Sequence, residues 1–266
     1  MSALRRDSVG YTIGFAVVVC LVCAIPIAGA AVFLRPSQVE NQRVDRLSKV
    51  LAVAGLMTAD DDLSRAEILE RFAQNITPRV VDLKTGEVVD SVDAESYDQR
   101  VAARDPARSD VAPENEARVL RLPRLAVVYE LREGDNIKAL ILPIQGYGLW
   151  STMYGYLALE ADARTVSGIT FYEHGETPGL GGEIENPRWQ QKWVGRKTFD
   201  ESGQLRIRVV KGATGPPAAD PHRIEGLSGA TITSRGVSNT VLFWLGPQAF
   251  GPYLDRYRST RREGTS

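Results

Sequence analysis

The 266-residue chain is predicted to adopt an α+β fold, in which a single N-terminal transmembrane helix precedes a mixed α+β domain. Two observations predict this class. The segment Tyr11–Leu34 is apolar and carries no charged residue, as expected of a membrane anchor. Strand-like patterns cluster in the middle of the chain and helical patterns lie at its ends. This segregation favours an α+β domain over a regular alternation of strands and helices.

The apolar segment Tyr11–Leu34 exceeds the roughly 20 residues that a helix needs to cross a bilayer. A cleaved signal peptide would have a shorter apolar core, so residues 1–36 are interpreted as a tail and an uncleaved anchor, with Pro26 as a kink site. Cys20 and Cys23 lie inside this segment and are interpreted as small apolar side chains rather than as a metal or redox pair. Basic residues flank both ends, so their distribution does not favour an inside N-terminus.

Residues 37–123 are predicted to form a helical connector, a hairpin and an exposed charged insertion. The acidic run Asp60–Asp62 suits the start of the second helix, because carboxylates favour a helix N-terminus. No further ligands follow it at a metal-loop spacing, so no metal site is expected there. The segments are, in order, helix 44–54, helix 63–73, hairpin 79–89 and insertion 91–116.

Residues 124–258 are predicted to form the main domain. Two strand pairs come first, and the first pair is joined by the turn Glu133–Asn136. A short helical segment, one further strand and a closing helix follow, and Gly246-Pro247 ends that helix. The strands are predicted at 125–131, 137–144, 154–160, 166–172 and 205–210, and the helices at 189–194 and 234–245.

The composition excludes several classes of function. The chain carries 32 basic and 33 acidic residues with no basic block, which does not fit nucleic-acid binding. It has no cysteine after Cys23, so the main domain holds neither a disulfide nor an iron–sulfur cluster. No Gly-x-Gly-x-x-Gly turn follows a strand, so a nicotinamide site has no support.

The segment Ser228–Ser234 is the most informative one for function. Four hydroxyl side chains lie beside Gly229 and Ala230 where a loop turns into a helix. A helix N-terminus favours phosphate, and small residues allow an anion to approach the backbone closely. The alternative is an ordinary helix cap with spare hydroxyl groups.

The motif Ser228–Thr233 resembles the flavinylation motif of the covalent FMN-binding domain family. The resemblance implies that the Thr233 hydroxyl is esterified to the FMN phosphate. A second block, Glu176–Gly181, is similar to the flavin-facing loop of that family. A third, Gly146–Tyr156, resembles the C subunit of the sodium-translocating NADH:quinone oxidoreductase. The covalent FMN-binding family usually has Asp eight residues before the modified threonine, and this chain has Glu225 at that position.

The resemblance implies a membrane-anchored flavoprotein subunit that relays electrons within a sodium-translocating NADH:ubiquinone reductase and has no complete catalytic activity alone. Its implied partners are the other subunits and a flavin transferase that uses FAD and magnesium. The implied location is the bacterial inner membrane, with one span and the domain on the periplasmic side. The runner-up is the flavin subunit of the related Rnf complex, which the third block and the long N-terminal helix disfavour.

Roles for individual residues follow from the same resemblance. Trp150 and Leu180 are expected to wall the flavin ring, and Gly179 and Gly181 to let the loop lie against it. Glu176 and Thr177 are expected to hydrogen-bond the polar edge of the ring. The Glu176 carboxylate would oppose extra negative charge on a reduced flavin, and Lys211 would have the reverse effect. The residues expected around the phosphate are Ser228, Gly229, Ala230 and Thr231. Each could instead be only a turn, core or surface residue.

No side chain in the sequence is an evident base for the Thr233 hydroxyl, so another enzyme is expected to install the flavin. His174 and His222 are interpreted as structural or surface residues. No catalytic or metal-binding residue is expected in the chain itself. Two functions from other classes remain open: a hydrolase with Ser228 as nucleophile, although it lacks the Gly-x-Ser-x-Gly elbow, and a binding module with an empty anion site.

Overall fold

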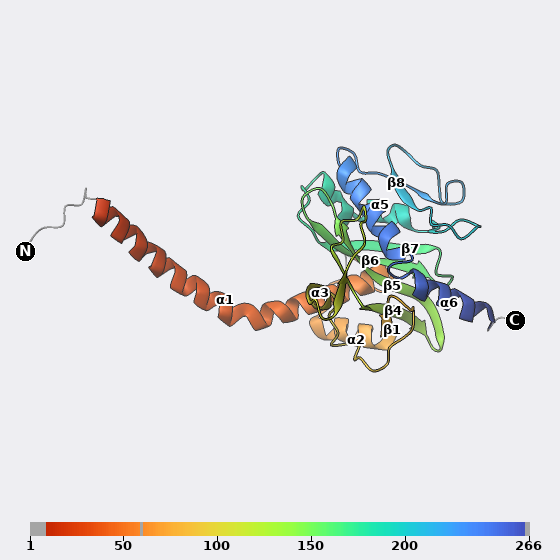
Figure 1. The fold of residues 1–266 in the computed structure, drawn as a ribbon, viewed down its shortest axis with the longest axis horizontal. Coiled ribbons are helices and arrows are strands. Elements are labelled where there is room, and N and C mark those ends of the chain that lie inside the picture. The colour runs from red at the N-terminus through yellow and green to blue at the C-terminus, as the bar shows by residue number, and fades with distance from the viewer. Residues whose placement is uncertain (1–8, 59–60, 264–266) are drawn as a thin grey trace, which may run out of the picture. The chain divides into compact units, whose positions relative to one another are not determined.

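The computed structural model describes residues 9–58 and 61–263 (Figure 1). The chain divides into two compact units, Met1–Asp45 and Arg46–Ser266. Helix α1 (Val9–Val53) runs from the first unit into the second, and neither Pro26 nor Pro36 ends it. The predicted anchor and the first connector helix are therefore one continuous helix.

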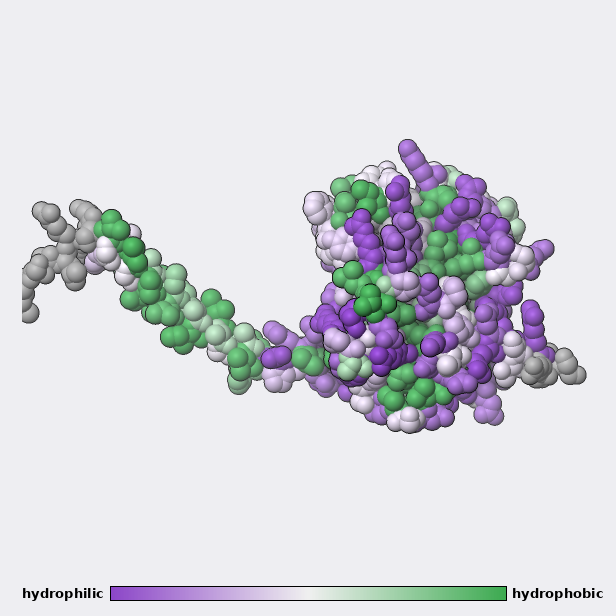
Figure 2. Space-filling view, viewed as in Figure 1, coloured by the Kyte–Doolittle hydropathy of each residue, from purple (hydrophilic) through white to green (hydrophobic). Residues whose placement is uncertain are grey.

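The apolar part of α1 is, among the described residues, the one helical stretch long and apolar enough to cross a membrane. Its large apolar side chains, from Val9 to Leu34, are exposed, and they form the apolar surface seen along this helix in Figure 2. Exposed apolar side chains over such a length fit a lipid environment rather than water.

The domain is built on a five-stranded antiparallel sheet with the order β1-β4-β5-β6-β7. The two predicted strand pairs are confirmed, and Gly134, at φ +58°, makes the turn between β4 and β5. The first arm of the predicted hairpin is β1, which pairs with β4 on one edge; its second arm forms one bridge on the other edge, between Val81 and Val88. The strands are β1 (Ile76–Asp82), β4 (Leu125–Glu133), β5 (Asn136–Tyr147), β6 (Thr152–Glu160) and β7 (Val166–Glu173).

Helix α5 (Thr231–Leu245) packs on the sheet against β5 (Figure 1). The contact is close because both partners have glycine at the crossing. A Cβ added at Gly236 would lie 2.5 Å from the carbonyl oxygen of Tyr147, and one at Gly146 would overlap the Thr240 side chain. The helix begins three residues before its predicted start at Ser234, so Thr233 lies inside its first turn.

The connector and the insertion are more ordered than predicted. Helix α2 (Arg65–Asn75) begins at a capping box, in which Ser64 and Glu67 satisfy each other's backbone amides. The acidic run is therefore not the cap; Asp60 lies outside the described residues. The insertion is not wholly exposed, since it contains the buried Ala102 and Ser109. Its elements are α3 (Gln99–Arg104) and β2 (Ser109–Val111), which pairs with β3 (Arg121–Pro123).

Short elements complete the C-terminal half. Strand β8 (Arg208–Val210) forms the second half of the predicted strand 205–210 and pairs in parallel with β9 (Arg223–Glu225); neither β9 nor this pairing was predicted. Helix α6 (Gly251–Glu263) was also not predicted and follows the break at Gly246-Pro247. The remaining elements are η1 (Gly181–Glu185), α4 (Pro187–Gln190) and η2 (Gln191–Trp193). The proposed domain limit at residues 123 and 124 falls between β3 and β4, inside the unit Arg46–Ser266.

Candidate functional site

The side chains of Thr233 and Glu176 form a buried pair where two of the motifs meet. Thr233 lies in the first turn of α5 and is 1% exposed, and Glu176 follows β7 and is 5% exposed. The Thr233 hydroxyl donates a hydrogen bond of 2.5 Å to Oε2 of Glu176. The prediction that no base lies next to this hydroxyl is therefore wrong.

The block Gly146–Tyr156, the third of the three motifs, holds the other carboxylate oxygen of Glu176. Oε1 accepts hydrogen bonds from the backbone amides of Trp150 (2.9 Å) and Leu149 (3.1 Å), with a longer one from Ser151 (3.4 Å). Burial alone would raise the pKa of Glu176. The hydrogen bonds from Thr233 and from these amides outweigh burial and leave the pKa below its ordinary value. The carboxylate is therefore ionised at neutral pH and held by the β5–β6 loop.

Two glycines make room for the pair. A Cβ at Gly181 would lie 2.6 Å from Oγ1 of Thr233 and 2.8 Å from Oε2 of Glu176. A Cβ at Gly148 would lie 2.5 Å from Oε1 of the same carboxylate. A side chain at either position would displace the pair.

The turn after Glu176 brings the second motif, Glu176–Gly181, into contact with the first, Ser228–Thr233. The Thr177 carbonyl accepts the amides of Leu180 and Gly182, and Gly179 makes the turn at φ +75° with open space around it. A Cβ at Gly229, which has φ +72°, would lie 3.0 Å from the Leu180 side chain. Leu180 therefore packs against the glycine of the first motif.

Apolar side chains stand exposed around the pair. Trp150 is 63% exposed and Leu180 is 45% exposed, which excludes the alternative that Trp150 is a core residue. Two further apolar side chains, which the sequence analysis did not single out, are likewise exposed: Leu149, whose amide binds Glu176, and Ile232, which precedes Thr233 in the chain. A surface of this kind suits a flat apolar ligand or a partner.

The first turn of α5 lacks a side-chain cap. Its cap residue is Ala230, whose side chain cannot accept a hydrogen bond, and the exposed hydroxyls of Ser228 and Thr231 make no capping contact. The Ser234 hydroxyl accepts the Leu227 amide and fixes the preceding loop. The ordinary-cap alternative is therefore wrong, and the positive end of the helix remains available to an anion.

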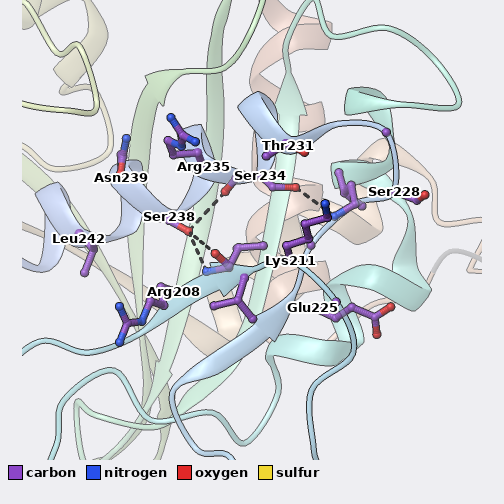
Figure 3. Close-up of a pocket in the computed structure, with 16 residues that line it drawn as sticks. Arg208, Lys211, Glu225, Ser228, Thr231, Ser234, Arg235, Ser238, Asn239 and Leu242 are labelled. Atoms are coloured by element: carbon purple, nitrogen blue, oxygen red, sulfur yellow. Dashed lines mark hydrogen bonds between the residues drawn. The ribbon is translucent and has the colours of Figure 1, made fainter.

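A cavity of about 660 Å³ lies between α5 and the β8–β9 pair (Figure 3). It is lined by Ser228, Gly229 and Thr231 of the first motif and by Lys211. Thr233 is not among its lining residues, because it belongs to the face of α5 that packs toward β5. Three of the four predicted phosphate residues thus meet Lys211 on one side of the helix start; the fourth, Ala230, does not line the cavity. Glu176, Gly181 and Thr233 meet on another side.

The cavity is positively charged. Arg208, Lys211 and Arg235 line it, and none of them forms an ion pair within the part of the chain that the structure describes. The one carboxylate on its wall, Glu225, is bound to Lys192 at 2.8 Å. The cavity therefore favours an anionic ligand.

Neither histidine contacts Thr233 in the structure. His174 is nearly buried: its Nδ1 accepts the Glu176 backbone amide at 3.1 Å, and its Nε2 lies 3.1 Å from a carboxylate oxygen of Glu185. His222 Nδ1 lies 2.7 Å from the Lys197 carbonyl oxygen. His174 therefore supports the loop that carries Glu176, and His222 supports a distant one.

The chain is similar to known proteins over most of its length. Residues 148–246 match the FMN-binding domain family. The C subunit of the Na(+)-translocating NADH-quinone reductase of Vibrio vulnificus (strain YJ016) is 49% identical, over 95% of this chain and 97% of that protein. The corresponding protein of Pseudomonas aeruginosa is 45% identical, over 96% and 98%.

Solved structures agree with these relatives. The crystal structure of Shewanella oneidensis NqrC superimposes with a TM-score of 0.76 and 31% identity, over 83% of this chain and 99% of that one. Sequence identity near one half over almost the full length of both proteins is decisive. The chain belongs to the NqrC family, that of the C subunit of the Na(+)-translocating NADH-quinone reductase.

Proposed function

We propose that this chain is the flavin subunit of a sodium-translocating NADH:quinone reductase and carries FMN as a phosphoester on Thr233. The observation that supports this most directly is the start of α5, where Thr233 lies in a first turn whose cap, Ala230, has no side-chain acceptor. Such a turn offers backbone amides and the positive end of a helix to a phosphate. Bound FMN supplies the capacity to accept electrons and pass them on.

The residues around the helix start fit the rest of the cofactor. Lys211 and Arg235 in the cavity bring positive charge to the start of α5, and the exposed Ser228 and Thr231 hydroxyls offer hydrogen bonds. Gly229 has a positive φ and no side chain, which lets the loop approach the phosphate closely. These residues bind and orient the phosphate end.

The ring would rest on the exposed apolar side chains. Trp150 and Leu180 flank the pair from two loops, and the turn at Gly179 leaves open space beside them. Thr177 lies exposed at the edge of this surface. Glu176 stays a proposed contact, but its oxygens face Thr233 and backbone amides, so its influence on the ring is through charge rather than a free hydrogen bond.

The proposed location is the bacterial inner membrane, with α1 as the anchor and the domain on the periplasmic side. The proposed partners are the other subunits of the reductase and a flavin transferase. The Rnf alternative predicts assembly with a different complex, so the proteins that co-purify with the full chain distinguish the two. A periplasm-restricted protease should degrade the domain in intact spheroplasts, and protection there would contradict the orientation.

The attachment is tested by isolating the full chain from its native host. Flavin fluorescence on a denaturing gel and an intact mass one FMN above the polypeptide are expected, and Thr233→Ala should lose both. Thr240→Ala is the matched control, because Thr240 is a buried threonine of the same helix that donates to the Gly236 carbonyl. Covalent flavin retained in Thr233→Ala would refute the proposal.

A further inference from the structure

The Thr233 hydroxyl is poised for proton transfer to a carboxylate. Its 2.5 Å hydrogen bond runs to an oxygen of Glu176, and both side chains are almost fully buried. A threonine hydroxyl is a weak nucleophile until a neighbouring base takes its proton. We propose that Glu176 is the general base for the esterification of Thr233, so that the acceptor protein supplies part of its own modification chemistry. This inference rests on the proposed attachment at Thr233.

The step balances with a flavin dinucleotide as co-reactant, delivered by the transferase. The Oγ1–H bond of Thr233 breaks and its proton passes to Oε2 of Glu176. A bond forms between Oγ1 and the phosphorus on the flavin side of the dinucleotide. The phosphoanhydride bond to the nucleoside monophosphate breaks, and that group leaves with the bonding electron pair. Glu176 then releases its proton to solvent or to the leaving phosphate, and no oxidation occurs.

No other described side chain is placed for this task. His174 lies two residues before Glu176, but its Nδ1 is occupied by the Glu176 amide and its Nε2 faces Glu185. The nearby carboxylate of Glu183 accepts a hydrogen bond from Asn186. The side chains of Arg208, Lys211 and Arg235 in the cavity are hydrogen-bond donors. Within the described part of the chain, Glu176 alone combines contact with Oγ1 and an ionised carboxylate.

The hydrogen bonds that hold the Glu176 carboxylate suit a base that must stay in place while the neighbouring turn moves. Thr233 is 1% exposed, so the turn from Thr177 to Gly182 has to open before a phosphate reaches Oγ1. The Glu176 carboxylate is held from the other side, by the amides of Leu149 and Trp150. Opening the turn therefore need not withdraw the carboxylate from Thr233.

The test follows flavin incorporation into the full-length chain in membranes, with transferase, FAD and Mg²⁺, by intact mass over time. Glu176→Gln keeps the size of the side chain and one acceptor oxygen for the loop amides, but it cannot take the proton. We expect incorporation to slow by about 10²-fold or more, in line with general-base contributions. Glu183→Gln is the matched control and should be labelled at the wild-type rate, with thermal unfolding reporting the folded fraction of each variant.

A second variant separates proton transfer from loop support. In Glu176→Ala, added formate should restore labelling in proportion to its concentration, since it replaces the missing carboxylate. Labelling of Glu176→Gln within about threefold of wild type would overturn the proposal. Should Glu176→Gln misfold, absence of formate rescue in Glu176→Ala would overturn it and rescue would support it. Failure of the wild-type chain itself to acquire flavin would instead refute the attachment at Thr233.

Discussion

Gly236 offers a test of how the packing of α5 positions the site. An added Cβ would lie 2.5 Å from the Tyr147 carbonyl oxygen and 3.1 Å from the Gly148 Cα. Both are backbone atoms at the end of β5, and they can shift only slightly. Restoring an ordinary contact of 3.4 Å to Tyr147 requires α5 to move by about 0.9 Å. Applied along the Thr233–Glu176 hydrogen bond, such a shift would stretch it from 2.5 Å to about 3.4 Å, beyond the range of O–H···O bonds.

The energetic cost of Gly236→Ala has two opposing parts. Overpacking a tight contact costs roughly 1–3 kcal/mol, and alanine is about 1 kcal/mol better than glycine inside a helix. We therefore expect a net loss of up to roughly 2 kcal/mol, which lowers the Tm of a domain of this size by up to roughly 8 °C. The protein should fold but lose most of its flavin incorporation, because the hydroxyl no longer meets its carboxylate.

The assay combines thermal unfolding with the intact mass of the chain from its native host. Gly215→Ala is the control, since a Cβ there meets only side-chain atoms at ordinary distances of 3.5 Å or more and the residue lies in a loop. Full flavin content and unchanged stability in Gly236→Ala would show that α5 does not depend on this contact. The reasoning about the Thr233–Glu176 geometry would then be refuted.

Three further predictions address the ring, the charge and the anchor. Trp150→Leu should change the absorption spectrum of the bound flavin and expose the ring to quenchers; an unchanged spectrum would mean that the indole, 63% exposed, does not contact it. The hydrogen bonds of Glu176 hold its pKa below the ordinary 4.5, so the stability they provide is present above pH 4.5 and is lost as the pH falls through the folded pKa. Acid unfolding curves of the flavin-free domain should thus be steeper below pH 4.5 for wild type than for Glu176→Gln, and parallel curves would contradict this. Removal of residues 1–34 should give a soluble domain, since no other described helix meets the length and hydropathy of a membrane span; membrane association of the truncated chain in high salt would contradict it.

Local patterns predicted the parts of the fold that depend on neighbouring residues. The strands β4–β7 show alternation along the chain, and the turn at Gly134 follows from a short sequence signal. The pairing of β1 with β4 and the parallel β8–β9 pair join distant segments, so no local signal specified them. The early start of α5 was missed because its cap is Ala230, which carries no capping signal.

For the site as well, the sequence indicated individual residues but not the contacts between distant ones. The three motifs, with Thr233 and the glycines, were identified through their resemblance to the covalent FMN-binding domain family. The contact between Thr233 and Glu176 was not, because it joins residues 57 positions apart, and only the packing of α5 onto β5 brings them together. The sequence analysis assigned Thr233 to the phosphate and Glu176 to the edge of the ring. The structure instead places a residue of the ring loop in direct contact with the hydroxyl.

That contact has a consequence for the mature protein. Once Oγ1 of Thr233 is esterified it has no proton, so Glu176 loses the donor that contributes most to lowering its pKa, and a phosphate charge lies close by. Both changes raise the pKa of Glu176 in the flavin-bearing chain relative to the flavin-free one. Carbon-13 NMR of the labelled Glu176 carboxyl across a pH titration measures this directly, with Glu183 as the reference. An identical Glu176 titration before and after attachment would mean that the carboxylate had already left Thr233 when the ester formed.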